Sequence, residues 1–263
     1  QTLSGVNGYV GFTQIDAGAT LALKGNGSIA NSSGIAFASG AGVGTFDISQ
    51  TNSGASVAGL NDTVGGSVVS LGAKTLTITG NRGPYDGVIQ DGGIGGGTGG
   101  NVTIASGGLA TFGGVNTYTG LTTISGGGQL DLTSGGSIAS SKAVINDGTF
   151  DISRAGGGVS INSLSGTSIF GAVNLGANTL TFTNANGTFA GTIRDGGAGG
   201  GVTITGGKEV LTGINTYTGS TTINGGTLEV DGSIANSLKV TVNSGGTLSG
   251  TGTVGSGDRK SVV

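Results

Sequence analysis

Short runs of alternating apolar and polar residues recur along the whole chain. Successive side chains of a strand point to opposite faces, so this period of two predicts strands with one buried face. No stretch of useful length has a helical period. The residues expected to point inward are Leu76, Ile78, Leu180, Phe182, Leu228 and Val230. Those expected to point outward are Thr75, Thr77, Thr179, Thr181 and Glu229.

Glycine-containing turns such as GGT and SGG separate these runs. Glycine adopts positive φ without steric cost, which suits tight turns. Two longer glycine-rich runs cover residues 92–100 and 196–201. They have no side chains to fill a core, and the backbone entropy of glycine opposes a regular strand. We expect irregular loops that protrude once per repeat.

The chain repeats itself. GVNTYTGLTTISGGGQLDL begins at Gly114, GINTYTGSTTINGGTLEV begins at Gly213, and a degenerate copy, NGYVGFTQIDAGATLAL, begins at Asn7. GSIAN or GSIAS follows each copy, and TFDIS occurs twice. The sequence therefore predicts about two and a half copies of one unit of roughly 100 residues. Their boundaries are 7–113, 114–212 and 213–257.

Many short strands are also compatible with a β-sandwich or a closed barrel. Direct tandem repeats, small turns and the scarcity of large side chains favour a solenoid, whose narrow interior is filled by stacked small apolar residues. At roughly 20 residues per turn, we expect an all-β, right-handed parallel β-helix of about 13 turns.

The two complete copies of the phrase resemble the passenger-associated repeat of autotransporters, the proteins of type V secretion. The resemblance is strict over about 35 residues, and the first copy departs from it at residues 128–130. It implies a structural motif within a secreted β-helical passenger, with a C-terminal outer-membrane barrel as its partner and no reaction of its own. The motif residues are Asn116, Thr117, Tyr118, Thr119, Gly120, Thr122, Thr123, Ile124, Asn215, Thr216, Tyr217, Thr218, Gly219, Thr221, Thr222, Ile223, Gly226, Thr227 and Leu228.

Composition removes most other chemistry. The chain has no His and no Cys, which excludes the common triads, thiol nucleophiles and His/Cys metal sites. Its net charge of −3 includes no basic stripe for nucleic acid. No apolar run approaches the length of a membrane-spanning helix, so we expect no membrane insertion by this segment. We expect no catalytic residue, cofactor or metal. Cysteine-free composition also fits passage through an oxidising periplasm.

Carboxylates are the remaining candidates for chemistry. The nearest pairs are Asp86 with Asp91 and Asp147 with Asp151, and the chain has two glutamates, Glu209 and Glu229. Acids on neighbouring turns could bind calcium or cleave a glycoside, but we expect turn residues or solvated strand faces. For Tyr118 and Tyr217, identical positions in the repeat favour packing over a carbohydrate-stacking platform.

These observations favour a surface-exposed stalk or adhesin segment of a Gram-negative bacterium, with host or neighbouring-cell ligands as further partners. A secreted β-helical polysaccharide lyase or hydrolase, and a filamentous adhesin exported by a separate protein, stay open as alternatives. The chain begins at Gln1 without a signal peptide, which we interpret as an internal fragment. The charged residues 258–263 break the Gly/Thr/Ser pattern, and we expect a non-native tail.

Overall fold

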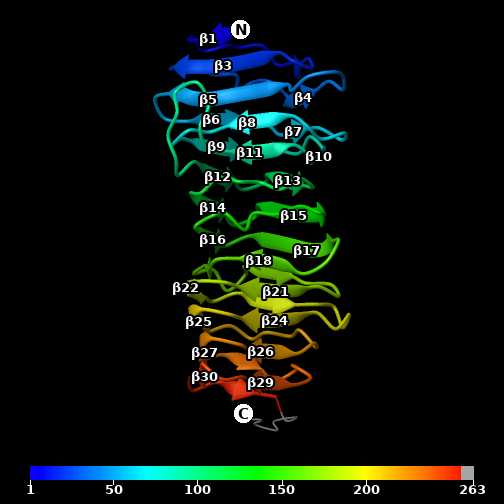
Figure 1. The fold of residues 1–263 in the computed structure, drawn as a ribbon, viewed down its shortest axis with the longest axis vertical. Coiled ribbons are helices and arrows are strands. Elements are labelled where there is room, and N and C mark those ends of the chain that lie inside the picture. Colours follow the sequence, from blue (N-terminus) through cyan, green and yellow to red (C-terminus); the bar gives the residue numbers. More distant parts are fainter. Residues whose placement is uncertain (256–263) are drawn as a thin grey trace. The chain divides into compact units, whose positions relative to one another are not determined.

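The computed structural model describes residues 1–255, and in that range the protein is entirely β (Figure 1). The predicted tail, 258–263, lies outside the described residues. No helix within residues 1–255 has the length and apolar character needed to cross a membrane. The chain forms a right-handed parallel β-helix of about 12 turns, close to the expected number.

The chain divides into two compact units. Unit 1 comprises Gln1–Asp131 and Gly135–Lys142, and unit 2 comprises Leu132–Ser134 and Ala143 onward. The strands of unit 1 are β1 (Thr2–Leu3), β2 (Thr13–Ile15), β3 (Thr20–Gly25), β4 (Ile35–Phe37), β5 (Thr45–Thr51), β6 (Ala55–Val57), β7 (Leu60–Asn61), β8 (Val68–Ser70), β9 (Thr75–Ile78), β10 (Pro84–Tyr85), β11 (Val88–Gln90), β12 (Asn101–Ile104), β13 (Leu109–Phe112) and β14 (Leu121–Ile124). Strand β15 (Gln129–Ser134) contains the boundary.

The strands of unit 2 are β16 (Ala143–Asn146), β17 (Thr149–Ala155), β18 (Val159–Ile161), β19 (Leu164–Ser165), β20 (Ala172–Asn174), β21 (Thr179–Phe182), β22 (Ala185–Phe189), β23 (Thr192–Arg194), β24 (Gly201–Ile204), β25 (Gly207–Leu211), β26 (Thr221–Ile223), β27 (Gly226–Val230), β28 (Ser233–Ile234), β29 (Val240–Val242), β30 (Gly246–Ser249) and β31 (Thr253–Val254).

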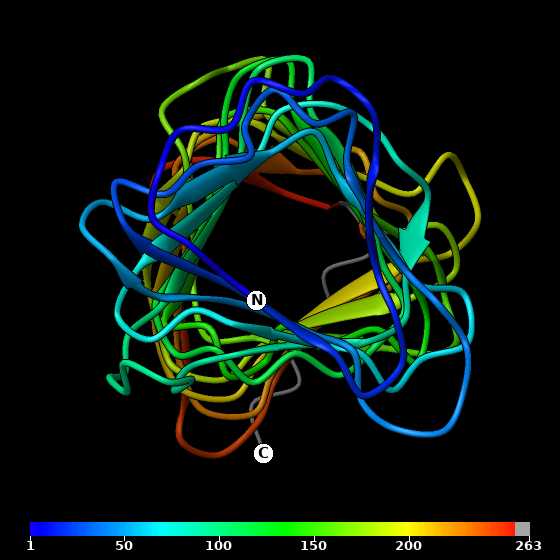
Figure 2. The same cartoon turned by 90° about the horizontal axis from the view of Figure 1, so that it is seen from above.

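Within unit 1, each strand pairs in parallel with the strand one turn earlier or later. One sheet has the order β1-β3-β5-β8-β11, and another contains β6, β9, β12 and β14. Thr103 lies beside Thr123, which sets a spacing of about 20 residues per turn. Seen along its axis, the first unit has walls of parallel strands around an interior that side chains fill (Figure 2).

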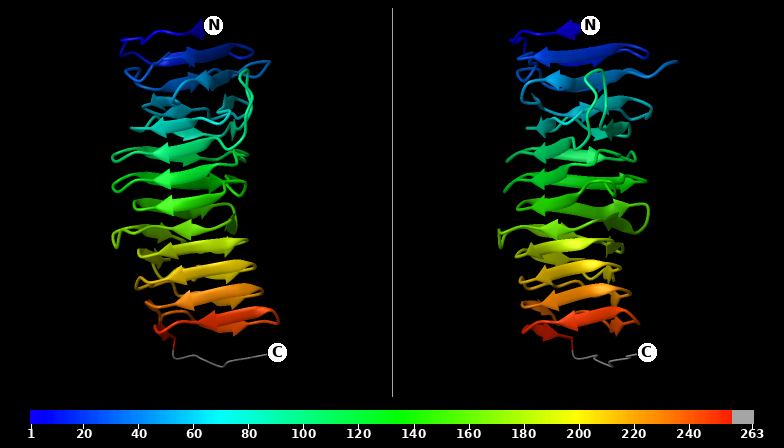
Figure 3. Two further views of the ribbon diagram at one scale, coloured as in Figure 1. Left: turned by 90° about the vertical axis from the view of Figure 1, so that its left-hand side faces the viewer. Right: turned by 60° about the vertical axis from the view of Figure 1, so that its left-hand side comes forward.

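Unit 2 is built in the same way. Its sheets include β18-β21-β24-β26-β29 and β22-β25-β27-β30, again all parallel. Thr203 lies beside Thr222, so corresponding residues stack from one turn to the next. The stacked arrows of each unit are clearest in the two side views (Figure 3).

The predicted inward and outward faces are confirmed. Leu76, Leu180 and Leu228 are fully buried, and so are the apolar residues two positions after each. The residues expected to point outward, Thr75, Thr77, Thr179, Thr181 and Glu229, are each partly exposed. Burial of stacked Leu, Ile, Val and Phe supplies the driving force that each turn needs to hold its neighbour.

The two glycine-rich runs are loops, as expected, except that Gly201 is the first residue of β24. The loop at 92–100 leaves the wall of unit 1 and folds back along its outside. There the N–H of Ile94 donates to the carboxylate of Asp47 at 2.7 Å, and the N–H of Gly95 donates to the hydroxyl of Ser49 at 2.7 Å. This loop, teal-green in Figure 3, is therefore attached to β5.

Candidate functional site: the Asn-Thr-Tyr-Thr-Gly turns

The asparagine of the repeated phrase connects three successive turns. Asn116 is buried, and its Oδ1 accepts the N–H of Ile89 at 2.9 Å. Its Nδ2 donates to the carbonyls of Gly114 and Ser137, both at 3.1 Å. The side chain thereby satisfies backbone groups of its own turn, the preceding turn and the following turn. Asn215 makes the same bonds, to Ile193, Gly213 and Ser233.

The tyrosine begins a chain of hydroxyl groups inside the wall. The hydroxyl of Tyr118 lies 2.6 Å from that of Thr122, which donates to Ser141 at 2.9 Å. Ser141 in turn donates to the carbonyl of Gly120 at 2.9 Å. Tyr118 is 0% exposed, and burial raises its pKa well above the ordinary value, with the hydrogen bond between Tyr118 and Thr122 opposing the rise. Its ring is therefore inaccessible to a sugar.

The same chain occurs in unit 2, where Tyr217, Thr221 and Ser237 end on the carbonyl of Gly219. It also occurs in the degenerate copy, where Tyr9, Thr13 and Ser32 end on Gly11. Tyr9, however, is 41% exposed. The four-residue spacing from Tyr to Thr thus produces the same local structure in all three places.

The second threonine of the phrase fastens the glycine-rich loop of the preceding turn. Thr218 donates its N–H and its hydroxyl to the carboxylate of Asp195, at 2.9 and 2.6 Å. The same carboxylate accepts the N–H groups of Gly197, Gly199 and Gly200. Burial opposes ionisation of Asp195, but the bonds from Thr218 and the glycines outweigh it and lower its pKa to about 2.

Asp91 occupies the corresponding place in unit 1. It accepts the N–H groups of Gly99 and Gly100 and the hydroxyl of Thr119, the last at 2.6 Å. In each glycine-rich loop, one aspartate therefore accepts backbone N–H groups of the loop and a threonine hydroxyl of the repeated phrase in the next turn. These bonds hold the loop against that turn. These loops do not present their aspartates as free cation ligands.

The other residues of the phrase fix close backbone contacts. A Cβ at Gly120 would overlap the carbonyl oxygen of Gly100, and one at Gly219 would overlap that of Gly199. The N–H groups of Thr117 and Thr216 donate to the carbonyls of Ile89 and Ile193. Thr122, Ile124, Thr221, Ile223 and Leu228 face inward, whereas Thr123, Thr222 and Thr227 face outward. Gly226 has φ of 72°, which favours glycine.

The serines that directly follow the GSIAN and GSIAS segments belong to the same structure, although the sequence did not identify their role. Ser32, Ser141 and Ser237 are buried acceptors and donors in the hydroxyl chains. The signal was present, because each segment follows its copy of the phrase by about one turn.

The expectation that the acids lie in turns or on solvated strand faces is wrong for Glu209. Asp147 is a turn residue whose Oδ1 accepts the N–H groups of Thr167 and Ser168 at 2.8 Å, and Glu229 forms an outer-face ion pair with Lys208 at 2.7 Å. Glu209, expected on a solvated face or in a turn, is 0% exposed and points inward. Its place in β25 is opposite Leu228, an inward position, and this register overrides its polarity. In residues 1–255 no group of three or more acids could hold a metal ion.

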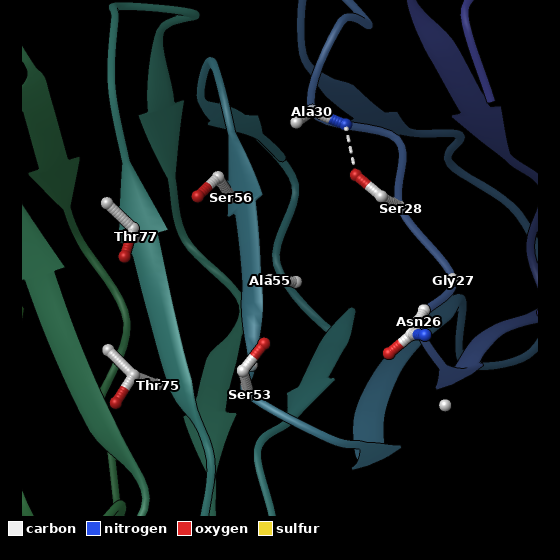
Figure 4. A pocket seen from close by; sticks show the side chains of 11 residues that line it. Asn26, Gly27, Ser28, Ala30, Ser53, Ala55, Ser56, Thr75 and Thr77 are labelled. Atoms are coloured by element: carbon white, nitrogen blue, oxygen red, sulfur yellow. Dashed lines mark hydrogen bonds between the residues drawn. The ribbon is translucent and has the colours of Figure 1, made fainter. Parts of the chain in front are cut away.

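A groove of about 280 Å³ lies on the outer surface of unit 1, beside β6 and β9 (Figure 4). Small polar side chains, among them Asn26, Ser53, Ser56, Thr75 and Thr77, face it. The N–H of Ala30 donates to the hydroxyl of Ser28 at its edge, at 3.2 Å. None of the lining residues is ionisable or aromatic. The groove therefore has no lining group for acid–base catalysis and no base to activate its serine and threonine hydroxyls.

The fold and its cross-turn side-chain bonds define a parallel β-helix of repeated structural turns. Over 86 residues, 31% of this chain, the sequence is 45% identical to the protein named adhesin BmaC autotransporter from Brucella suis biovar 1 (strain 1330). The chain spans about 2% of the length of that relative. No family model matches the chain, and no solved structure matches it. The β-helix and this similarity together fit the passenger domain of an autotransporter.

Proposed function

We propose that the chain is a segment of a non-enzymatic, surface-displayed stalk that presents adhesive surface and assists its own export by folding turn by turn. One observation carries this proposal. Within each unit, strands pair in parallel with the turn before and the turn after, so a turn needs only its neighbour to fold. A chain that emerges progressively from a pore can then fold outside it, and folding opposes return.

The cross-turn bonds of Asn116 and Asn215 support this role, as does the similarity to a protein named as an adhesin. We infer that the motif residues are structural, that the repeats at 7–113, 114–212 and 213–257 are equivalent folding segments, and that the export partner is a C-terminal outer-membrane barrel of the same polypeptide. The proposed location is the exterior of a Gram-negative cell, facing host or neighbouring-cell ligands.

Surface display of the intact polypeptide tests the proposal. Cells expressing it are labelled with an antibody against this segment, with and without external protease. We expect labelling that protease removes. Asn215→Leu should reduce the labelled amount because three turns lose bonds to its amide, and the outward Thr222→Leu is the control. Segment antigen confined inside the cells would contradict the proposal.

Catalysis is tested with the purified chain on a panel of acidic and neutral polysaccharides. We expect no cleavage with any of them. If the wild-type chain cleaves a polysaccharide and Asp86→Asn or Asp147→Asn abolishes that activity, the stalk proposal is wrong and the chain is an enzyme.

A further inference from the structure

One carboxylate of unit 2, that of Glu209, is fully buried and points into the interior. Glu209 is on β25, whose neighbours in register place Gly187 on one side and Leu228 on the other. Leu228 in turn lies beside Leu248. Glu209 thus stands in a column of interior positions that otherwise hold apolar residues or glycine.

Gly187, the register neighbour of Glu209, packs closely against residues 163 and 164. A Cβ at Gly187 would overlap the carbonyl oxygen of Leu164. Neither oxygen of Glu209 makes a hydrogen bond of normal geometry. Burial raises the pKa of Glu209 to about 8, and the N–H of Leu164 and the hydroxyl of Ser163 offset only part of that effect.

Within residues 1–255, no positive charge contributes to the pKa of Glu209 or is placed to hold its ionised form. Strand β22 and residues 162–166 contain no ionisable side chain, and neither do β21, β24 and β26 of the same turns. The adjacent residue Lys208 pairs with Glu229 on the outer face. Arg194 on β23 is exposed and bonds to Asn174. An ionised Glu209 could gain hydration only if its turn opened.

We propose that Glu209 makes the closure of the β22, β25 and β27 turns sensitive to pH, with the protonated form closed and the ionised form loosened. The sign follows from linkage. Below the ordinary pKa of 4.5 the carboxyl is protonated whether the turn is folded or not, so its contribution to stability is complete. Between 4.5 and about 8 the unfolded form ionises first, and stability falls as pH rises. The unfolding equilibrium constant should increase about tenfold per pH unit in that range.

Few other groups could cause the same fall in stability between pH 4.5 and about 8. The chain has no His and no Cys, the side chains that ordinarily titrate between pH 6 and about 8.5. Aspartates whose pKa is lowered by hydrogen bonds, such as Asp195, act below pH 4. The buried Tyr217 has a raised pKa and ionises only in strong alkali.

The test measures urea unfolding of the full chain from pH 4.5 to 9, together with hydrogen exchange corrected for the intrinsic rate. We expect wild-type amides of β22, β25 and β27 to lose protection as pH rises. Glu209→Gln should remove this slope. Glu229→Gln, one strand away and outward, should retain it.

Glu209→Leu provides a second variant that matches Leu228 and Leu248 in the same column. It should be independent of pH over this range and more stable than the wild type at pH 8 and above. A wild-type slope equal to that of both Glu209 variants would overturn the proposal. So would loss of protection located away from β22, β25 and β27.

Discussion

Two buried carboxylates in unit 2, Asp195 and Glu209, have pKa values shifted in opposite directions. Asp195 accepts five hydrogen bonds from N–H and hydroxyl groups, and its pKa falls to about 2. Neither oxygen of Glu209 makes a hydrogen bond of normal geometry, and burial raises its pKa to about 8. The difference lies in where the backbone is free to donate. In the glycine-rich loop the N–H groups are not paired in a ladder, whereas in the sheet around β25 neighbouring strands already use them.

The largest effect should come from adding a second unsupported carboxylate to the interior. Leu228→Asp places a carboxylate beside Glu209, in a position without donors. We expect a loss of several kcal/mol in the free energy of unfolding, because a buried charge without partners is costly. Urea unfolding of the purified chain measures it, and the outward Thr227→Asp is the matched control. Equal stability of the two variants would refute the inward register.

Removing the well-supported carboxylate should cost less. Asp195→Ala leaves the N–H groups of Gly197, Gly199 and Gly200 without their acceptor, and we expect a loss of about 2 kcal/mol. Asp195→Asn keeps one acceptor oxygen and should lose less.

The pH response of Asp195 should have the opposite sign to that of Glu209. Its stabilisation is present above the ordinary pKa of 3.8 and is lost as pH falls through about 2. Acid unfolding curves of wild type and Asp195→Asn measure this. Identical curves below pH 4 would show that the loop does not depend on the charge.

A neutral hydroxyl group extends the comparison. Tyr217→Phe removes the bond to Thr221 inside the wall, and we expect a loss of about 1 kcal/mol. Tyr9→Phe removes the same bond where the ring is 41% exposed, so water replaces it and the loss should be close to zero. Thermal unfolding of both variants measures the contrast, and equal losses would contradict it.

The smallest effect is expected for a carboxylate that lies neither in a glycine-rich loop, as Asp195 does, nor in the interior, as Glu209 does. Asp86 is half-buried beside Tyr85. Asp86→Asn should change the free energy of unfolding by no more than about half a kcal/mol. Urea unfolding at neutral pH measures it, and a larger loss would indicate a structural role.

The alternation of Leu76 with Ile78, and of Leu228 with Val230, was enough to predict the strands and their inward faces. The period of two ties every side chain to a face once the register is known. The same argument failed for Glu209 because Val210 and Leu211 are both apolar and obscure the alternation. Aligning GKEVL of β25 with GTLEV of β27 would have placed Glu209 opposite Leu228.

The candidate site was only partly predictable. The repeated phrase marked Asn116 and Tyr118 as equivalent to Asn215 and Tyr217, but repetition does not specify a partner. The asparagine side chains bond to residues about 20 positions away, which only the stacking of turns brings close. The role of Asp195 also depends on a loop whose shape its glycines leave open.

The asparagine bonds have a mechanical consequence. Because Asn116 joins its own turn to the preceding and the following turn, a pull that separates that turn must also break these side-chain bonds. The smallest piece that yields under tension should be a group of neighbouring turns, with the asparagine as the point of rupture.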